Sequence, residues 1–119
     1  RKAPSDSAYV IHNVDSGFVV DCGWRRAPFS NKAAGVAIQV NHARIKRSHI
    51  VNIDTGPTSI QGRVLFVRTR NEQYDLGLFA MYFSPKPSKT KLWVAYHRTC
   101  ETMLIWFVGL INDLPARCT

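Results

Sequence analysis

Acidic residues are scarce in this chain of 119 residues, which contains 8 Asp and Glu against 16 Lys and Arg and carries a formal net charge of +8. The acidic side chains occur singly, without the D-x-D, D-x-N or E-x-x-H pairings that would suit a divalent-metal site. The sequence therefore argues against a complete metal site within this chain. The positive charge favours a polyanionic partner such as nucleic acid, although a fragment separated from its acidic part would also be basic.

Cysteine is sparse as well. Cys22, Cys100 and Cys118 are far apart and form no C-x-x-C pair, so neither a disulfide framework nor a zinc site is indicated. No apolar run approaches the roughly 20 residues that cross a bilayer, and the N-terminus shows no signal-peptide pattern. We therefore expect reduced cysteines, no membrane partner and an intracellular location, either cytoplasmic or nuclear.

Other common catalytic motifs are missing too. The sequence has no G-x-S-x-G elbow and no Walker-type phosphate loop, which are the usual local signs of a serine hydrolase or a nucleotide hydrolase. His12, His42, His49 and His97 do not stand at ligand spacing to one another or to a cysteine. A single histidine of this kind is more often a surface residue than a general base.

What the sequence does contain is a succession of short extended segments followed by one helix. Alternating and apolar runs predict the strands, a short polar link at residues 71–73 predicts a hairpin, and apolar residues at helical spacing predict an amphipathic helix that packs on the sheet. The expected strands are residues 9–14, 17–22, 33–40, 49–53, 61–70 and 74–83, and the expected helix is residues 92–112.

The second strand of the hairpin is apolar on both faces, which predicts a central strand covered on both sides. Tyr82 lies at its C-terminal end, where the chain leaves the sheet. Taken by itself, this residue could equally be a core aromatic with its hydroxyl at the rim. The order of strands, hairpin and helix predicts an α/β domain, with residues 1–119 forming a single partial domain.

Basic residues follow these elements at several points, in a pattern that suits a groove tracking a phosphate backbone. A solvated basic surface would give the same pattern. The candidate nucleic-acid-binding residues are Arg25, Arg26 and Lys32 in one loop, Arg63 at the start of the hairpin, and Lys86 and Lys89, with Lys91, just after Tyr82.

Three segments occur in an order that resembles the central strands of the endonuclease/exonuclease/phosphatase superfamily. They are residues 34–38 (AGVAI), 61–64 (QGRV) and 78–85 (LFAMYFSP), and Tyr96-His97-Arg98 fits the aromatic-Arg start of the following helix. This superfamily includes the apurinic endonucleases and the nucleases of non-LTR retrotransposons. Residues 21–29 (DCGWRRAPF) resemble the retroelement members in particular.

The resemblance implies part of a four-layer α/β/β/α sandwich, with mostly antiparallel mixed sheets and one long helix near the C-terminus. It implies Mg²⁺-dependent phosphodiester cleavage in the full-length domain, with Tyr82 as the catalytic residue that points its hydroxyl at the scissile phosphate. The family's metal-binding Glu would precede Arg1, and its Asp-x-Asn and Asp-His pairs would follow Thr119, so this chain alone is expected to bind no Mg²⁺ and to be inactive. One departure is Ser84, which stands where the family's Tyr-x-Pro turn has Pro, one place before Pro85.

Two other functions remain open from the sequence: a non-catalytic basic module that binds nucleic acid, and a degenerate interaction domain. The expected partner is DNA, with RNA or a smaller phosphoester as alternatives. A sandwich without its outer strands would expose sheet edges, and we therefore also expect self-association.

Overall fold

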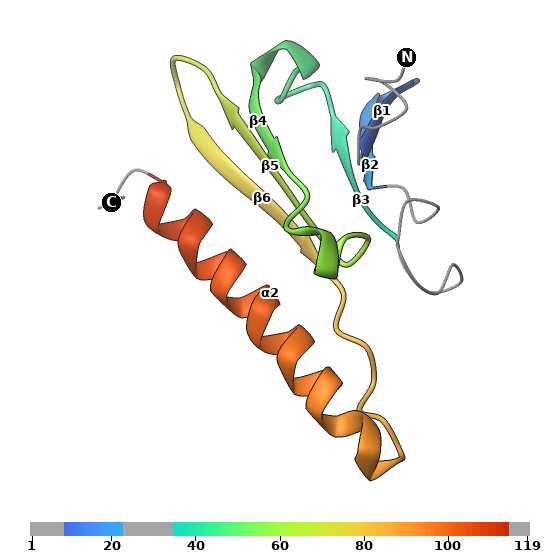
Figure 1. The fold of residues 1–119 in the computed structure, drawn as a ribbon. Helices are drawn as coiled ribbons and strands as arrows, with labels where there is room; N and C mark the ends of the chain where they lie inside the picture. The colour runs from blue at the N-terminus through green and yellow to red at the C-terminus, as the bar shows by residue number, and fades with distance from the viewer. Residues whose placement is uncertain (1–8, 23–34, 115–119) are drawn as a thin grey trace, which may run out of the picture.

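The computed structural model describes residues 9–22 and 35–114 (Figure 1). Strands form where apolar and polar residues alternate, and the helix forms where proline is absent and apolar residues recur at helical spacing. The elements are β1 (Tyr9–Val14), β2 (Gly17–Cys22), β3 (Val36–Asn41), β4 (Ile50–Asp54), β5 (Val64–Arg70), β6 (Asp75–Met81) and α2 (Trp93–Asp113), with 3₁₀ turns at Arg47–His49, Thr58–Ile60 and Thr90–Leu92.

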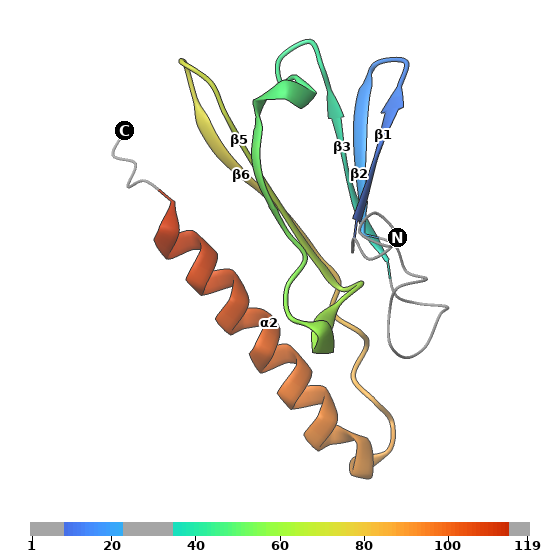
Figure 2. The ribbon, with the colours of Figure 1, turned by 45° about the horizontal axis from the view of Figure 1, so that its top comes forward.

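The strands form two antiparallel sheets in which each strand pairs with its neighbours in the chain. Sheet A has the order β1-β2-β3 and sheet B the order β4-β5-β6. Sheet A stacks on one face of sheet B, and α2 lies on the other side of sheet B (Figures 1 and 2). The described residues therefore form a three-layer β/β/α arrangement, and the predicted mixture of strands with one long C-terminal helix is confirmed.

The main core lies between the two sheets. Successive side chains of a strand point to opposite faces, so β2 directs Phe18, Val20 and Cys22 inward while β5 directs Leu65 and Val67 toward them. These side chains are all but inaccessible to solvent. Each fully buried aliphatic or aromatic side chain stabilises the fold by about 1.5–3 kcal/mol, so this layer holds the two sheets together.

A second core lies between sheet B and α2. The alternate residues of β5 face the helix: Val64 packs with Ile60 and Met103, and the ring of Phe66 lies 4.8 Å from that of Phe79. Phe79 in turn contacts α2, because its ring centroid lies 4.7 Å from that of Phe107. The helix is thus held on the sheet by aromatic and methionine contacts.

The hairpin prediction is confirmed, but the position of its second strand in the sheet is not. The strand β6 is covered on one face by sheet A and on the other by α2, as its apolar residues indicated. Among the described strands, however, β5 is the central strand of sheet B and β6 is at its edge. Apolar residues on both faces of a strand indicate that other layers cover both faces. They do not indicate whether a second strand pairs with each of its edges.

Two smaller expectations also need correction. The sequence predicts a buried strand at residues 33–40. In β3 only Val40 is buried, and the other residues are half-buried or exposed because the outer face of sheet A is open. The helix was expected to be amphipathic, yet its outer face carries large apolar side chains that are more than half exposed, namely Val94, Leu104, Ile105 and Val108.

One polar contact fastens the middle of α2 to the end of β4. The indole Nε1 of Trp106 donates a hydrogen bond of 2.9 Å to Oδ1 of Asp54, and the same oxygen accepts a 2.8 Å hydrogen bond from the backbone N–H of Gly56. Gly56 has a φ of 79°, which favours glycine because it lacks a Cβ. The carboxylate thus links a tight turn of sheet B to the helix.

Replacing Trp106 with Phe is expected to lower the free energy of unfolding by about 1–2 kcal/mol. The ring contact with Phe79 can be kept, but the hydrogen bond to a charged acceptor is lost. Urea unfolding would measure the difference, with Trp93→Phe at the start of the helix as the control. Equal stability of the Trp106 variant and the unsubstituted chain would contradict a structural role for this contact.

Candidate functional site

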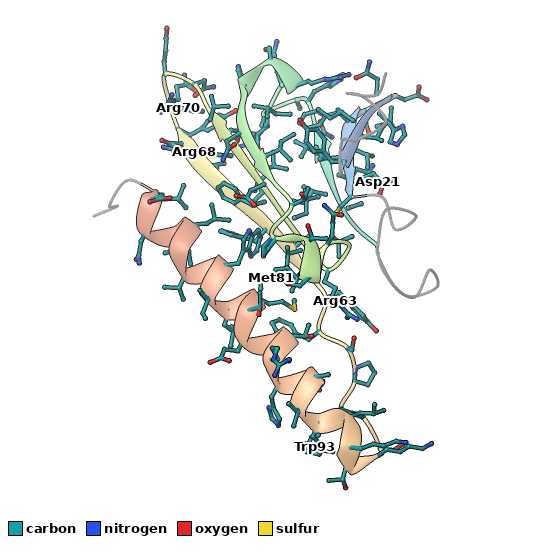
Figure 3. All side chains as sticks on the ribbon, viewed as in Figure 1. Asp21, Arg63, Arg68, Arg70, Met81 and Trp93 are labelled. Carbon is teal, nitrogen blue, oxygen red and sulfur yellow. The ribbon has the colours of Figure 1, made fainter. Side chains whose placement is uncertain are left out.

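Two of the sequence-predicted site residues, Arg63 and Tyr82, lie together at one end of sheet B. Arg63 immediately precedes β5, and Tyr82 immediately follows β6. The backbone N–H of Tyr82 donates a hydrogen bond of 2.8 Å to the carbonyl oxygen of Arg63. The two residues are therefore cross-strand neighbours, placed together by the hairpin. Figure 3 shows Arg63 at this end and Arg68 and Arg70 at the opposite end of the hairpin.

Tyr82 continues a strand face that begins with Leu78 and Ala80. Both of these residues pack toward sheet A, and the period of two along an extended chain assigns Tyr82 to the same side. Unlike them, Tyr82 lies past the end of the strand and is 37% exposed. The residue is thus a rim aromatic that a ligand in solution can reach.

Ser84 fixes the Arg63 side chain. The guanidinium of Arg63 donates a hydrogen bond to the Ser84 hydroxyl, and both residues are half-buried. A proline at position 84 would supply no hydroxyl to accept this bond. The departure from the Tyr-x-Pro pattern therefore coincides with a contact that orients the arginine beside Tyr82.

The lysines lie on the connection from Tyr82 to the helix. Lys86 places its ammonium 5.1 Å from the ring centroid of Trp93, a cation–π geometry. Lys89 and Lys91 are exposed near the same turn, which leads into α2. These charges form one basic rim between the end of β6 and the start of the helix.

Arg25, Arg26 and Lys32 lie outside the described residues. The residues that flank this segment are Cys22 and Gly35, and Cys22 pairs with Val36 across β2 and β3. Burial raises the pKa of the Cys22 thiol, and a hydrogen bond with the backbone of Gly62 opposes that effect. This contact places the end of β2 beside Gly62, the residue that precedes Arg63.

Basic residues at the opposite end of the hairpin have carboxylate partners. The Arg68 guanidinium makes two hydrogen bonds to Asp75, of 2.8 Å from Nε and 2.6 Å from a terminal nitrogen. The hydrogen bond to Asp75 raises the pKa of Arg68. Arg70 lies 4.0 Å from the same carboxylate. These arginines therefore stabilise the hairpin end and are not part of the candidate site.

A cavity of about 240 Å³ lies between the connection after β6 and the first half of α2, and Arg63 forms part of its wall. Sequence reasoning did not single it out. Its walls include Tyr96 and Cys100, which are four residues apart and therefore share a helix face. Desolvation raises the pKa of the Tyr96 hydroxyl, and a hydrogen bond with Cys100 adds to this effect. The only sequence signal for the cavity was that helical spacing.

The described residues do not fit a magnesium ion. No group of three or more His, Cys, Asp or Glu side chains that could hold a metal occurs among residues 9–22 and 35–114. The carboxylate of Asp54, at the end of β4, is already engaged by Gly56 and Trp106. We therefore derive no chemical step through a metal from these residues. What they offer is a phenol, a guanidinium and ammonium groups, all of which can donate to phosphate oxygens.

Comparisons of this chain with protein-family models, with curated proteins and with solved structures give no match. In the described part of the chain, no helix combines the length and the apolar character needed to cross a membrane.

Proposed function

We propose that residues 1–119 form the central section of a Mg²⁺-dependent phosphodiesterase of the endonuclease/exonuclease/phosphatase type that acts on DNA. In this proposal the section binds the phosphate backbone, while the metal-binding carboxylates belong to other parts of the domain. The chain alone then binds nucleic acid without cleaving it.

The single observation that carries the proposal is the pairing of Tyr82 with Arg63. The backbone hydrogen bond between them holds both residues at the same strand end, and Ser84 orients the arginine. A hydroxyl and a guanidinium carried by two paired residues, with lysines on the adjoining connection, are groups that can recognise a phosphodiester. The segments that carry the family resemblance include both Arg63 and Tyr82.

The layer arrangement supports the four-layer interpretation. One helix covers the outer face of sheet B. On the outer face of sheet A, Val10 is 43% exposed and Val14 is 37% exposed. Apolar side chains on an open sheet face suit a covering layer. In the proposal, the fourth layer of the sandwich lies on this face.

The chemical role of each residue follows from its donor groups. Tyr82 donates a hydrogen bond from its hydroxyl to a non-bridging oxygen of the scissile phosphate, and Arg63 stabilises the negative charge that develops there. Lys86 and Lys89 contact neighbouring phosphates and set the register of the strand. A bound metal would supply activation of water and neutralisation of the leaving oxygen.

The test compares two polypeptides on supercoiled plasmid DNA with and without Mg²⁺. Residues 1–119 are expected to bind DNA with an affinity that falls steeply with salt, and to produce no nicks. A longer polypeptide, which also contains the residues encoded on either side of this chain, is expected to nick the plasmid in the presence of Mg²⁺. In that longer polypeptide, Tyr82→Phe should slow nicking by about a hundredfold, the usual loss for one transition-state donor.

The matched control is Tyr74→Phe, which also removes a phenolic hydroxyl. That hydroxyl lies at the opposite end of the hairpin and makes a 2.8 Å hydrogen bond with His49, so its loss should leave nicking unchanged. Nicking by residues 1–119 alone, or equal rates for Tyr82→Phe and the unsubstituted polypeptide, would overturn the proposal. Salt-dependent binding without nicking by the longer polypeptide would favour a non-catalytic nucleic-acid-binding module.

A further inference from the structure

The cavity that Arg63 helps to line is not used by the phosphate contacts proposed above. It opens between the connection that follows β6 and the N-terminal half of α2, and its volume is about 240 Å³. Ligand sites for drug-sized molecules usually measure roughly 300–1,000 Å³. A cavity somewhat below that range suits one small ring system rather than a larger molecule.

The walls of this cavity favour a flat, unsaturated ring. Phe83 and Tyr96 supply aromatic surfaces, and Pro85 and Pro87 supply rigid apolar ones. Phe83 is 43% exposed, so a large aromatic face is open to a ligand at this position. Bases of single-stranded nucleic acids stack on such aromatic side chains, and the stacking tolerates any base because every base has a π-face.

Charge at the cavity favours an anionic ligand over a cationic one. Arg63 lines the wall, and none of the described residues that line the cavity is acidic. The connection that forms one wall also carries Lys86. Ser84 and Thr99 add hydroxyl groups to the wall, and these can donate to or accept from polar atoms at the edge of a ring. A ring that carries a phosphate matches this set of groups.

We infer that this cavity binds one unpaired nucleobase of the strand whose phosphate meets Tyr82 and Arg63. The inference rests on the proposed function and goes beyond it, because it assigns a base contact as well as a phosphate contact. Arg63 belongs to both sites, since it lines the cavity and hydrogen-bonds through its carbonyl with Tyr82.

The test compares two fluorescent single-stranded oligonucleotides of equal length, one of thymidines and one of abasic sites. Their phosphate charges are equal, so a difference in affinity for residues 1–119 reports the bases. The thymidine strand is expected to bind about tenfold tighter, because the stacking of one base on an aromatic side chain raises the affinity by about that factor. Ala95→Phe should reduce that ratio to about one, because Ala95 lines the cavity and the added ring fills it.

The matched control is Val94→Phe, one residue earlier on the helix. Val94 is 66% exposed and does not line the cavity, so this variant should keep the tenfold ratio. Circular dichroism checks that both variants retain the helix. A second measurement needs no variant: a 2-aminopurine in the strand should lose fluorescence on binding as it stacks in the cavity.

The outcomes separate the two proposals. Tight, salt-dependent binding with equal affinity for both oligonucleotides would overturn the nucleobase site and leave the phosphate contacts in place. A ratio that Ala95→Phe does not change would also overturn it. Failure of residues 1–119 to bind either oligonucleotide would overturn the proposed function together with the nucleobase site.

Discussion

Replacing Gly17 with Ala is expected to lower the free energy of unfolding by about 3 kcal/mol. Gly17 opens β2 and pairs with Asn41 of β3. A Cβ at this position would stand 1.8 Å from the carbonyl oxygen of Val40 and 2.9 Å from the backbone nitrogen of His42. Both atoms are backbone, so no side-chain rotation relieves the overlap and the two strands must separate. Overpacking of a close contact usually costs about 1–3 kcal/mol, and we expect the upper end here.

Gly109→Ala provides a control with the opposite sign. Gly109 lies in α2, and a Cβ there would meet nothing within 4 Å. Alanine has a higher helix propensity than glycine, so this variant should gain about 0.5–1 kcal/mol. Urea unfolding followed by circular dichroism measures both. Unchanged stability of Gly17→Ala would show that β2 and β3 do not approach each other as closely as described.

Phe66→Ala is expected to have the largest effect of the side-chain truncations, about 3–5 kcal/mol. Phe66 is 2% exposed and lies on the β5 face that supports α2. Its ring is the first of a series that runs through Phe79 to Trp106 and Phe107 on the helix. Deleting it leaves a cavity beneath the helix, and typical domains have only about 5–15 kcal/mol of stability in total.

The control for this variant is Phe83→Ala, which removes the same ring from a position that is 43% exposed. A smaller loss, about 1 kcal/mol, is expected because less apolar area leaves the core. Denaturant unfolding gives the stabilities, and near-ultraviolet circular dichroism reports the aromatic packing. A loss below about 1 kcal/mol for Phe66→Ala would contradict the packing of α2 on sheet B.

Much of the fold was predictable because its strands pair with their neighbours in the chain. The register of a hairpin follows from the position of its link. With Val64 opposite Met81 and Arg70 opposite Asp75, the next pair outward is Arg63 and Tyr82. Recognising the polar link at residues 71–73 was therefore enough to predict the hairpin and to place Tyr82 at the strand end. The paired strands, at residues 64–70 and 75–81, are shorter than the predicted 61–70 and 74–83.

The cavity was not predictable in the same way. Its walls come from the connection after β6 and from a helix that extends beyond the end of the sheet (Figure 1). How far the helix extends past the sheet depends on how Met103 of α2 and Phe79 of β6 pack between the two elements, not on periodicity. The contact between Arg63 and Ser84 is similar, because hydrogen bonds between side chains 21 residues apart leave no local pattern in the sequence.

The pairing of every described strand with its chain neighbour also bears on how the molecule folds. Each sheet is a meander in which paired strands follow one another in the chain, with links that range from two residues between β1 and β2 to thirteen between β2 and β3. Such local pairings require little loop closure and favour fast folding. The core that contains Val20 and Val67, by contrast, joins the two sheets over a long stretch of chain. We therefore expect the two meanders to behave as separate cooperative units in hydrogen exchange, with their docking as the slower step.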